Sequence, residues 1–265
     1  MKEFFFSVGQ AALTQLIGVL GIFFLFGWLL SIIQTWTQQK YHESVGWKGI
    51  LWTAWLGTPI HEVGHMVFAK LFRHRIERVA LFQPNEETGD LGSVGHSFAK
   101  YSLYQRIGNF FIGAAPLIFG SLFLVLLLYF LLPNGREVFT PLSHQPNSLL
   151  EAFTSFRGTL THLFSVENLR AWNFWVFLYV SFCIASHMAP SQPDRKNMWG
   201  GFFWLVLILL VVNSIAALIH RDPTAYILRL NQYLGIVAGM FLYALLLSVL
   251  HLILATVVLL PFRRR

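Results

Sequence analysis

Two histidines and a glutamate lie within five residues of one another in the run His61-Glu62-Val63-Gly64-His65. On a helix, residues i and i+4 share one face, so both imidazoles can bind the same Zn²⁺ ion. A glutamate beside the first histidine is the usual general base for a metal-activated water. The spacing therefore predicts a hydrolytic zinc site with His61 and His65 as ligands and Glu62 as the catalytic base.

The motif lies in a strongly apolar part of the chain. Its apolar neighbours are Trp52, Trp55, Leu56, Ile60, Met66, Val67, Phe68 and Leu71. Ionisable side chains inside a bilayer are costly, and a functional role is the first hypothesis for them. The nearest Lys or Arg is Lys70, so we expect a cation such as a metal ion as the partner of these three residues. The alternative is a His/Glu cluster that is held by hydrogen bonds and binds no metal.

The composition predicts an integral, multi-pass membrane protein. Of the 265 residues, 55% are hydrophobic and only 12% are charged, whereas a soluble domain has about 25% charged residues. The lipid bilayer is therefore an expected partner. The net charge of +7 then reflects topology and contact with lipid headgroups, and we expect no nucleic-acid partner. The single cysteine, Cys183, excludes an intramolecular disulfide.

Six stretches have about the length and apolar character that a membrane span needs. They are Val8 to Ile33, Trp47 to Phe72, Leu103 to Leu132, Ala171 to Met188, Trp199 to Ile219 and about Tyr233 to Leu260. The first is too long for the apolar region of a signal peptide, so we expect an uncleaved span. The sequence predicts an all-α polytopic membrane protein with about six transmembrane helices in a single domain, residues 1–265.

Two connections contain predicted elements of their own. Residues Ile76 to Phe98 hold two short β-prone runs around a polar turn with Gly89, which predicts a small β-hairpin after the second span. From Leu149 to Phe164, apolar residues recur at helical spacing. This pattern predicts an amphipathic helix, which either lies in the membrane interface or packs on the spans.

Lysine and arginine in the connections predict the orientation in the membrane. With the N-terminus in the cytoplasm, the inside segments hold 12 of these residues and the outside segments hold 7. We therefore expect both termini on the cytoplasmic side of a bacterial inner or plasma membrane. His61 and His65 then lie in the cytoplasmic half of the second span, level with the end of the fourth.

Zinc needs a third protein ligand and leaves the fourth position for water. The best candidate is Asp194, the only acidic residue between Glu167 and Asp222. It follows a proline-interrupted segment at the predicted level of the motif, where irregular backbone is tolerated if it lines a polar cavity. His187 is the rival ligand. Asp194 could instead be an ordinary loop carboxylate beside Arg195 and its basic neighbour.

The chain resembles the site-2 protease (M50) class of intramembrane zinc metalloproteases. The resemblance is carried by the histidine motif in an early span, by Gly113-Ala114-Ala115-Pro116-Leu117 in the span after the hairpin, and by the Pro190 to Asp194 segment. The second is similar to a Gly-Pro-containing motif of the family and the third to its Asn/Pro…Asp-Gly motif. Together they cover about residues 50–200.

Two departures from the family pattern concern these motifs. Pro193 and Arg195 flank Asp194 where the family usually has Leu-Asp-Gly, and Ala115-Pro116 replaces Gly-Pro.

The resemblance implies an enzyme that hydrolyses peptide bonds of membrane-spanning protein substrates near the cytoplasmic face. It implies Zn²⁺ held by His61, His65 and Asp194, with Glu62 as the base. The altered segment around Asp194 motivates one alternative, a metal-binding membrane scaffold without activity. A second alternative is an ion-coupled transporter that uses the same three ligands, although the internal symmetry of such transporters is not visible in the sequence.

Overall fold

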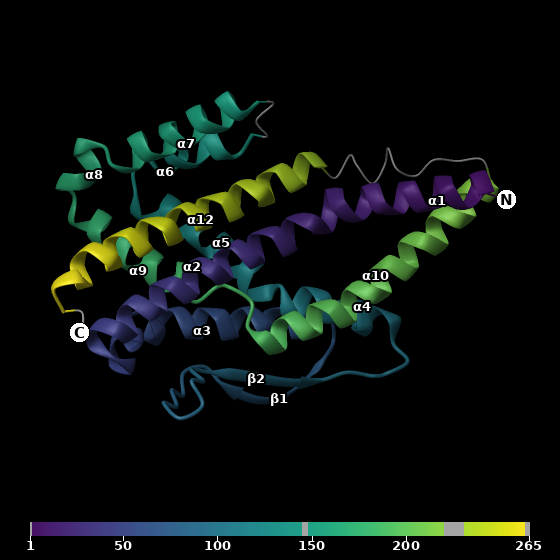
Figure 1. Cartoon of the computed structure of the whole chain (residues 1–265), viewed down its shortest axis with the longest axis horizontal. Coiled ribbons are helices and arrows are strands. Elements are labelled where there is room, and N and C mark those ends of the chain that lie inside the picture. The colour runs from purple at the N-terminus through teal and green to yellow at the C-terminus, as the bar shows by residue number, and fades with distance from the viewer. Residues whose placement is uncertain (1, 145–147, 220–230, 263–265) are drawn as a thin grey trace.

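The computed structural model describes residues 2–144, 148–219 and 231–262, and most of them lie in helices. The described chain also forms one two-stranded antiparallel sheet. Figure 1 shows the sheet on one side of the molecule and three short helices on the opposite side, with the long helices between them. These short helices are α6 (Gly135–Phe139), α7 (Leu149–Leu163) and α8 (Val166–Arg170). A mainly helical fold with a small hairpin, as predicted, is confirmed.

The first apolar run forms a longer helix than predicted. It is built from α1 (Lys2–Gln15), a π-helical turn η1 (Leu16–Leu20) and α2 (Gly21–Val45). Its candidate span, Val8–Val45, has 38 residues, which is about 57 Å at 1.5 Å per residue. The hydrocarbon core is about 30 Å thick, so this helix must tilt or extend beyond it.

Three of the described helices are long and apolar enough to cross a membrane. They are Val8–Val45, α10 (Gln192–Leu218) and Leu234–Phe262, which contains most of α12 (Asn231–Leu259) and the 3₁₀ turn η3 (Leu260–Phe262). The bent pair of α4 (Leu103–Gly113) and α5 (Ala115–Leu131) is a fourth candidate if it counts as one span. A multi-pass membrane protein is thus supported, whereas the predicted count of six spans is not confirmed.

The predicted third span is divided into two helices. α4 and α5 meet at an angle of 56°. Pro116 lies in the first turn of α5, and a proline has no N–H and clashes with the carbonyl four residues earlier. The apolar run is continuous in sequence, but the backbone cannot continue as one straight helix through this point.

The predicted second and fourth spans are also helices, but neither is among the three candidate spans. α3 (Trp47–Leu71) carries the histidine motif and contains Pro59. α9 (Trp172–Ala185) has 14 residues, about 21 Å, and is too short to cross the hydrocarbon core alone.

The predicted hairpin is formed by β1 (Arg75–Ala80) and β2 (Ser93–Ser97), which pair antiparallel. Gly89 in the connecting turn has φ +78°, a conformation that glycine adopts without strain. The hairpin lies against α3, because a Cβ on Gly92 would come within 2.9 Å of the Thr58 Cγ2 atom. This close approach lets the hairpin cover one side of the motif helix.

The three candidate spans alternate in direction. Phe23 on α2 packs against Phe241 on α12 with ring centroids 5.5 Å apart, and the Ser44 hydroxyl donates to the Leu259 carbonyl at 3.3 Å. α2 and α12 therefore run parallel and side by side (Figure 1). α10 runs antiparallel to them, because Gln15 bonds to Asn213 near the end of α10 and Phe24 contacts Trp199 near its start. If α2 and α12 each cross the membrane once in the same direction, the start of α2 and the end of α12 lie on opposite faces. The prediction that both termini lie in the cytoplasm therefore does not follow from these helices.

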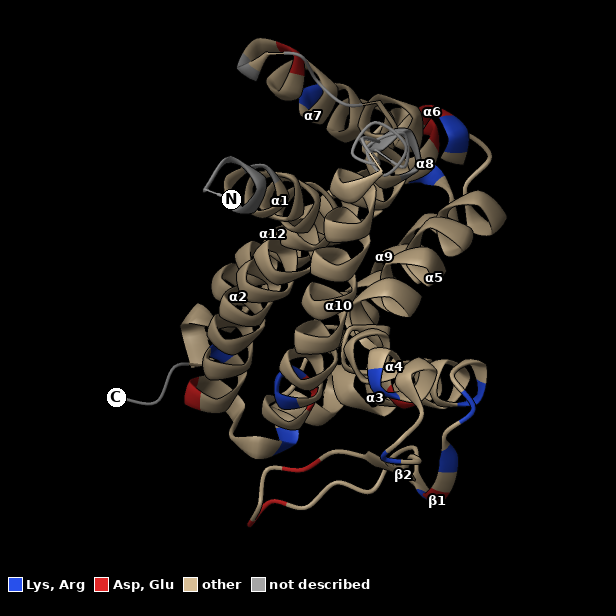
Figure 2. Ribbon diagram, turned by 90° about the vertical axis from the view of Figure 1, so that its right-hand side faces the viewer, with Lys and Arg blue, Asp and Glu red and all other residues tan. Residues whose placement is uncertain are grey.

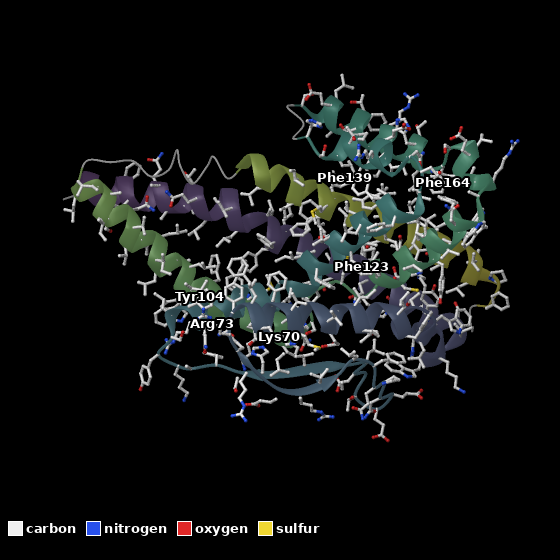
Figure 3. All side chains as sticks on the ribbon, turned by 180° about the vertical axis from the view of Figure 1, so that it is seen from behind. Lys70, Arg73, Tyr104, Phe123, Phe139 and Phe164 are labelled. Carbon is white, nitrogen blue, oxygen red and sulfur yellow. The ribbon has the colours of Figure 1, made fainter. Side chains whose placement is uncertain are left out.

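Charged residues gather at two ends of the structure. Figure 2 shows them around the hairpin and the neighbouring ends of α3 and α4, and again around α6, α7 and α8, while the ribbon between is largely uncharged. In Figure 3, Lys70, Arg73 and Tyr104 lie on the hairpin side, and Phe139 and Phe164 lie toward the short helices. This distribution fits a protein with an apolar belt between two polar ends.

The predicted amphipathic segment forms α7, so its helical structure is confirmed. The Ser148 hydroxyl caps its first turn by accepting from the Glu151 N–H. Leu150 and Phe153 are exposed at 72% and 63%. The position of this helix in the membrane interface stays a prediction.

Candidate metal centre

The α3 helix places the two motif histidines side by side. The Nε2 atoms of His61 and His65 are 3.1 Å apart, as the i, i+4 spacing predicts. His65 is buried and His61 nearly so. The predicted pair of imidazoles is thus present with both Nε2 atoms facing one point.

Two backbone carbonyls fix the protonation of these rings. The Nδ1 atom of His61 lies 2.6 Å from the His187 carbonyl oxygen, and Nδ1 of His65 lies 2.9 Å from that of Ile112. A carbonyl oxygen only accepts, so each Nδ1 carries the proton and donates it. In the neutral rings, each Nε2 therefore holds a lone pair. Two lone pairs 3.1 Å apart repel each other unless a cation or an additional proton lies between them.

The two accepting carbonyls are available for a local reason. The Ile112 carbonyl lies four residues before Pro116, which has no N–H to donate to it. His187 lies in the irregular segment after α9, where Pro190, three residues later, has no N–H to donate to its carbonyl. The break between α4 and α5 and the end of α9 thus provide the groups that orient the imidazoles.

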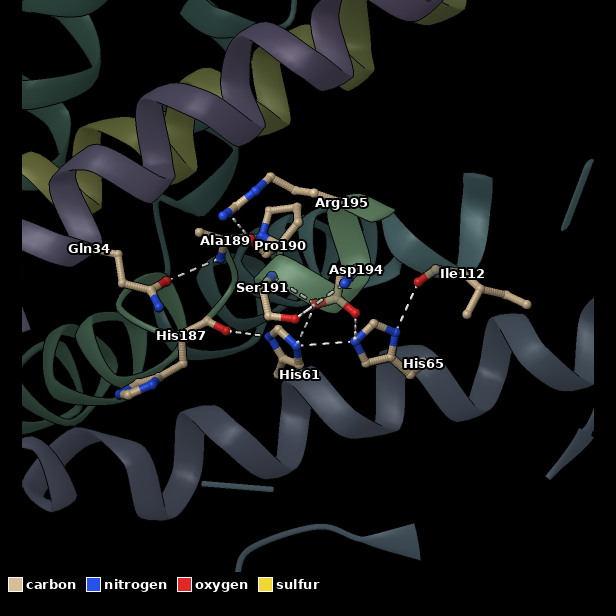
Figure 4. Close-up of polar contacts among 10 residues, drawn as sticks. All are labelled: Gln34, His61, His65, Ile112, His187, Ala189, Pro190, Ser191, Asp194 and Arg195. Atoms are coloured by element: carbon tan, nitrogen blue, oxygen red, sulfur yellow. Dashed lines mark hydrogen bonds and ion pairs between the residues drawn. The ribbon is translucent and has the colours of Figure 1, made fainter. Parts of the chain in front are cut away.

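Asp194 completes the cluster from the first turn of α10. Its Oδ1 atom is 3.1 Å from Nε2 of His65, and its Oδ2 atom is 3.5 Å from Nε2 of His61. The potential ligand atoms of the three residues lie within 4.8 Å of one another. Figure 4 shows the carboxylate directed at the two rings. The structure therefore brings together the two predicted histidines and the predicted third ligand, in a grouping that could hold a metal ion.

The carboxylate also caps its own helix. Oδ2 accepts from the Ser191 N–H at 2.8 Å and from the Ser191 hydroxyl at 2.6 Å. The Ser191 hydroxyl in turn accepts from the Asp194 N–H, which makes a reciprocal capping box. Because Oδ2 is occupied in this way, Oδ1 is the oxygen left for a metal ion.

Two glycines let the surrounding helices approach the motif closely. A Cβ on Gly113 would lie 2.3 Å from the Asp194 carbonyl oxygen, so α4 and the start of α10 are in backbone contact. A Cβ on Gly57 would lie 2.1 Å from the Cys183 carbonyl oxygen, where α3 meets α9. Side chains at these positions would separate the segments that carry Asp194 and the His187 carbonyl from the histidine pair.

His187, the rival ligand, lies outside the cluster. Its Nε2 atom is 3.0 Å from the Thr53 hydroxyl, and its ring points away from His61 (Figure 4). It contributes its backbone carbonyl to the site and not its imidazole. No pattern in the sequence predicts this role, which depends on where α9 ends.

The cluster borders a cavity of about 520 Å³. Its lining includes His61, Glu62, His65 and Asp194, and also His96 and the hairpin residues around Gly92. Glu62 is 6% exposed, and its carboxylate forms no hydrogen bond or ion pair with the described residues. The predicted base therefore faces the cavity without a protein partner, beside the histidine pair.

Further polar groups hold the segment that leads to Asp194. Gln34 on α2 accepts from the Ala189 N–H at 3.2 Å, and the Arg195 guanidinium donates to the Pro190 carbonyl at 2.8 Å (Figure 4). The prolines in this segment have no N–H, so these contacts satisfy part of an irregular backbone next to the cavity.

Comparison with protein-family models, with curated proteins and with solved structures gives no significant match for this chain.

Proposed function

We propose that this chain is an intramembrane zinc metallopeptidase of the site-2 protease type. One observation carries the proposal. The Nε2 atoms of His61 and His65 lie 3.1 Å apart, and Oδ1 of Asp194 lies 3.1 Å from Nε2 of His65. Glu62, which has no partner among the described residues, lines the same cavity. This is the set of groups that metal-assisted hydrolysis needs.

The spacing of the donor atoms supports zinc as the metal. With Zn–N distances of 2.0–2.1 Å and a tetrahedral angle, two ligand nitrogens are separated by about 3.3 Å. The 3.1 Å between the two Nε2 atoms and the 3.1 Å from His65 to Asp194 are close to this value. Two histidines with one carboxylate form a known ligand set of catalytic zinc, whereas calcium and magnesium prefer oxygen donors.

The chemistry divides among the residues of the cavity. A zinc ion held by His61, His65 and Asp194 would lower the pKa of a water molecule toward about 7 and polarise the carbonyl of the substrate. Glu62 would accept the proton of the attacking water and deliver it to the leaving amine. Ser191 would keep the Asp194 carboxylate in one orientation through Oδ2, and the two backbone carbonyls would keep the imidazoles in the tautomer that binds a metal.

The setting of the cavity supports a membrane-spanning protein as substrate. The site is built on apolar helices, and the hairpin that covers it belongs to a polar end of the molecule (Figure 2). This end carries Lys70, Arg73, Arg75, Arg78, Lys100, Arg106, Arg195 and Lys196. Such an excess of basic residues favours the cytoplasmic side. Our proposal therefore retains the predicted cleavage near the cytoplasmic face, in a bacterial inner or plasma membrane.

The test is the substitution Glu62→Gln in the full-length protein, purified in detergent and loaded with zinc. An amide cannot act as the base, so cleavage of β-casein, used as an unfolded probe, should fall by about 10²–10⁴-fold. Zinc content should stay at one ion per chain, since Glu62 is not a ligand. The exposed Glu167→Gln on α8 is the matched control and should behave like the wild type.

If the wild type cleaves and Glu62→Gln cleaves equally fast, the catalytic role of Glu62 is refuted. Zinc binding without any cleavage would favour the inactive scaffold. Flux of ions or solutes into liposomes that is independent of Glu62 would favour the transporter.

A further inference from the structure

A second histidine pair lies at the base of the hairpin. The Nδ1 atoms of His74 and His96 are 3.0 Å apart, and Nε2 of His74 is 2.9 Å from the Gln105 carbonyl oxygen. The carbonyl only accepts, so Nε2 of a neutral His74 carries the proton and its Nδ1 holds the lone pair. His96 must then donate its Nδ1–H to His74. This leaves Nε2 of a neutral His96 as a hydrogen-bond acceptor.

Burial favours the neutral form of both rings. Burial lowers the pKa of His74 below its usual range. The pKa of His96 is lowered to about 4, first by burial and then by the imidazoles of His74 and His65, against the opposing carboxylates of Asp194 and Glu77. Hydrogen-bond donation therefore runs from Nδ1–H of His96 to His74, and from Nε2–H of His74 to the Gln105 carbonyl oxygen.

The pair is anchored on both sides. The Gln105 side-chain amide donates to the Arg73 carbonyl at 2.8 Å, and its side-chain oxygen accepts from the Ala99 N–H at 2.6 Å. The ring of Phe98 stacks on His74 with centroids 5.3 Å apart. These contacts tie the end of α3, the end of β2 and the start of α4 together, so the His74 ring has a fixed position from which to hold His96.

His96 lines the same cavity as the metal cluster, but from the hairpin side. Its Nε2 atom has no hydrogen-bond partner among the described residues. A peptide offers carbonyl oxygens and N–H groups along its length. The proposed zinc ligands and Glu62 account for the scissile carbonyl and the attacking water, but they provide no neutral acceptor for a backbone N–H of the peptide on the hairpin side of the cavity.

We propose that His96 is a substrate-binding residue of this cavity, whose Nε2 atom accepts a hydrogen bond from a backbone N–H of the bound peptide. His74 is the positioning residue that holds His96 in the required tautomer. This inference rests on the proposed peptidase function and names a contact that selects peptides.

The test compares His96→Leu with the wild type in the zinc-loaded, full-length protein, with β-casein as the probe. Loss of one hydrogen bond between neutral groups should raise the KM about two- to twelvefold, with kcat unchanged and one zinc ion per chain retained. His74→Phe keeps an aromatic ring beside Phe98 and leaves the His96 Nδ1–H unpaired, so it should raise the KM in the same direction. His162→Gln, on α7 at the other end of the molecule, is the matched control and should leave the KM unchanged.

A second measurement reads the tautomer without any activity. In ¹⁵N-histidine NMR of the wild type at neutral pH, the signals that disappear in His96→Leu should belong to a ring protonated at Nδ1 and unprotonated at Nε2. The opposite tautomer would overturn the inference.

The kinetic outcomes separate this inference from the proposed function. A folded His96→Leu protein with wild-type KM overturns the role of His96 while leaving the peptidase proposal intact. Loss of zinc from the His96→Leu protein also overturns the substrate-binding role of His96, because this loss would show that His96 acts in metal binding. A wild type that binds zinc but cleaves nothing refutes the peptidase function, and the role of His96 with it.

Discussion

The double use of Asp194 gives the most specific prediction. One oxygen of its carboxylate caps α10 by accepting from Ser191, and the other faces the histidine pair. Two substitutions separate these roles. Asp194→Ala removes the proposed ligand and the cap together, whereas Ser191→Ala removes the hydroxyl contacts and leaves the ligand oxygen in place.

The expected magnitudes differ enough to be measured. Loss of a capping side chain costs about 0.5–2 kcal/mol of unfolding free energy, and either variant should show it. Loss of a group that only orients a metal ligand reduces the affinity about 10–100-fold, which is the effect we expect for Ser191→Ala. Asp194→Ala removes one of three protein ligands, so its zinc affinity should fall by more than about 100-fold.

Competition with a chromophoric zinc chelator measures the affinity, and circular dichroism on heating measures the stability. The matched control is Ser165→Ala, because Ser165 caps α8 by accepting from the Asn168 N–H at 3.3 Å, outside the metal cluster. It should lose stability and keep its zinc affinity. If Asp194→Ala binds zinc as tightly as the wild type, Asp194 is not a ligand and the reasoning is refuted.

Three further predictions concern packing, pH and orientation. Gly57→Ala should destabilise the protein by about 1–3 kcal/mol, because the added Cβ would lie 2.1 Å from the Cys183 carbonyl oxygen. The loss should appear as a lower thermal midpoint, and an unchanged midpoint would contradict the contact of α3 with α9. Between pH 6.5 and about 4, His96 binds a proton when unfolded but not when folded, so protection of the hairpin amides from hydrogen exchange should fall as the pH falls through this window. His96→Gln should weaken that dependence, and an equal dependence in both proteins would argue against it. Single cysteines can be placed by Glu86→Cys and Glu167→Cys in a Cys183→Ser background, and they should react with an impermeant maleimide from opposite faces of the membrane. In intact cells Glu86→Cys should be protected from labelling. Equal labelling of both cysteines would refute the proposed orientation.

The sequence was sufficient to predict the centre of the site. The i, i+4 spacing places the two imidazoles on one face whatever the tertiary structure, and the helix over residues 47–71 confirms this local geometry. Asp194 was predicted because few acidic residues lie at a suitable level of the membrane. The structure brings it to the histidines through the close packing of α4 and α10 at Gly113.

The boundaries of the helices were harder to predict for physical reasons. An apolar run continues through Pro116, so hydropathy does not reveal that the chain bends there. The helix that begins the chain extends past Ile33 because polar residues such as Gln34 do not end a helix. The parallel course of α2 and α12 depends on which apolar faces pack together, and charge counts in the connections contain no information about that.

The groups that orient the site were not predicted at all. The carbonyls of Ile112 and His187 and the ring of His96 reach the site through contacts between segments that are far apart in the sequence, whereas Ser191 contacts Asp194 within one helix turn. Ser191 does belong to a motif with fixed spacing, the capping box with Asp194, whereas the two carbonyls and the His96 ring belong to none. They became visible only when the fold placed the ends of α4, α9 and β2 around the motif helix.

The most direct test of the central claim is X-ray absorption spectroscopy at the zinc edge of the zinc-loaded, full-length protein. The predicted spectrum contains two imidazole nitrogens at 2.0–2.1 Å and a carboxylate oxygen at about 2.0–2.2 Å. The oxygen contribution should change in Asp194→Ala, and zinc should be lost when His61 and His65 are both replaced by alanine. A protein that retains no zinc after dialysis, or whose zinc spectrum shows no histidine ligands, would contradict a metal centre at these three residues.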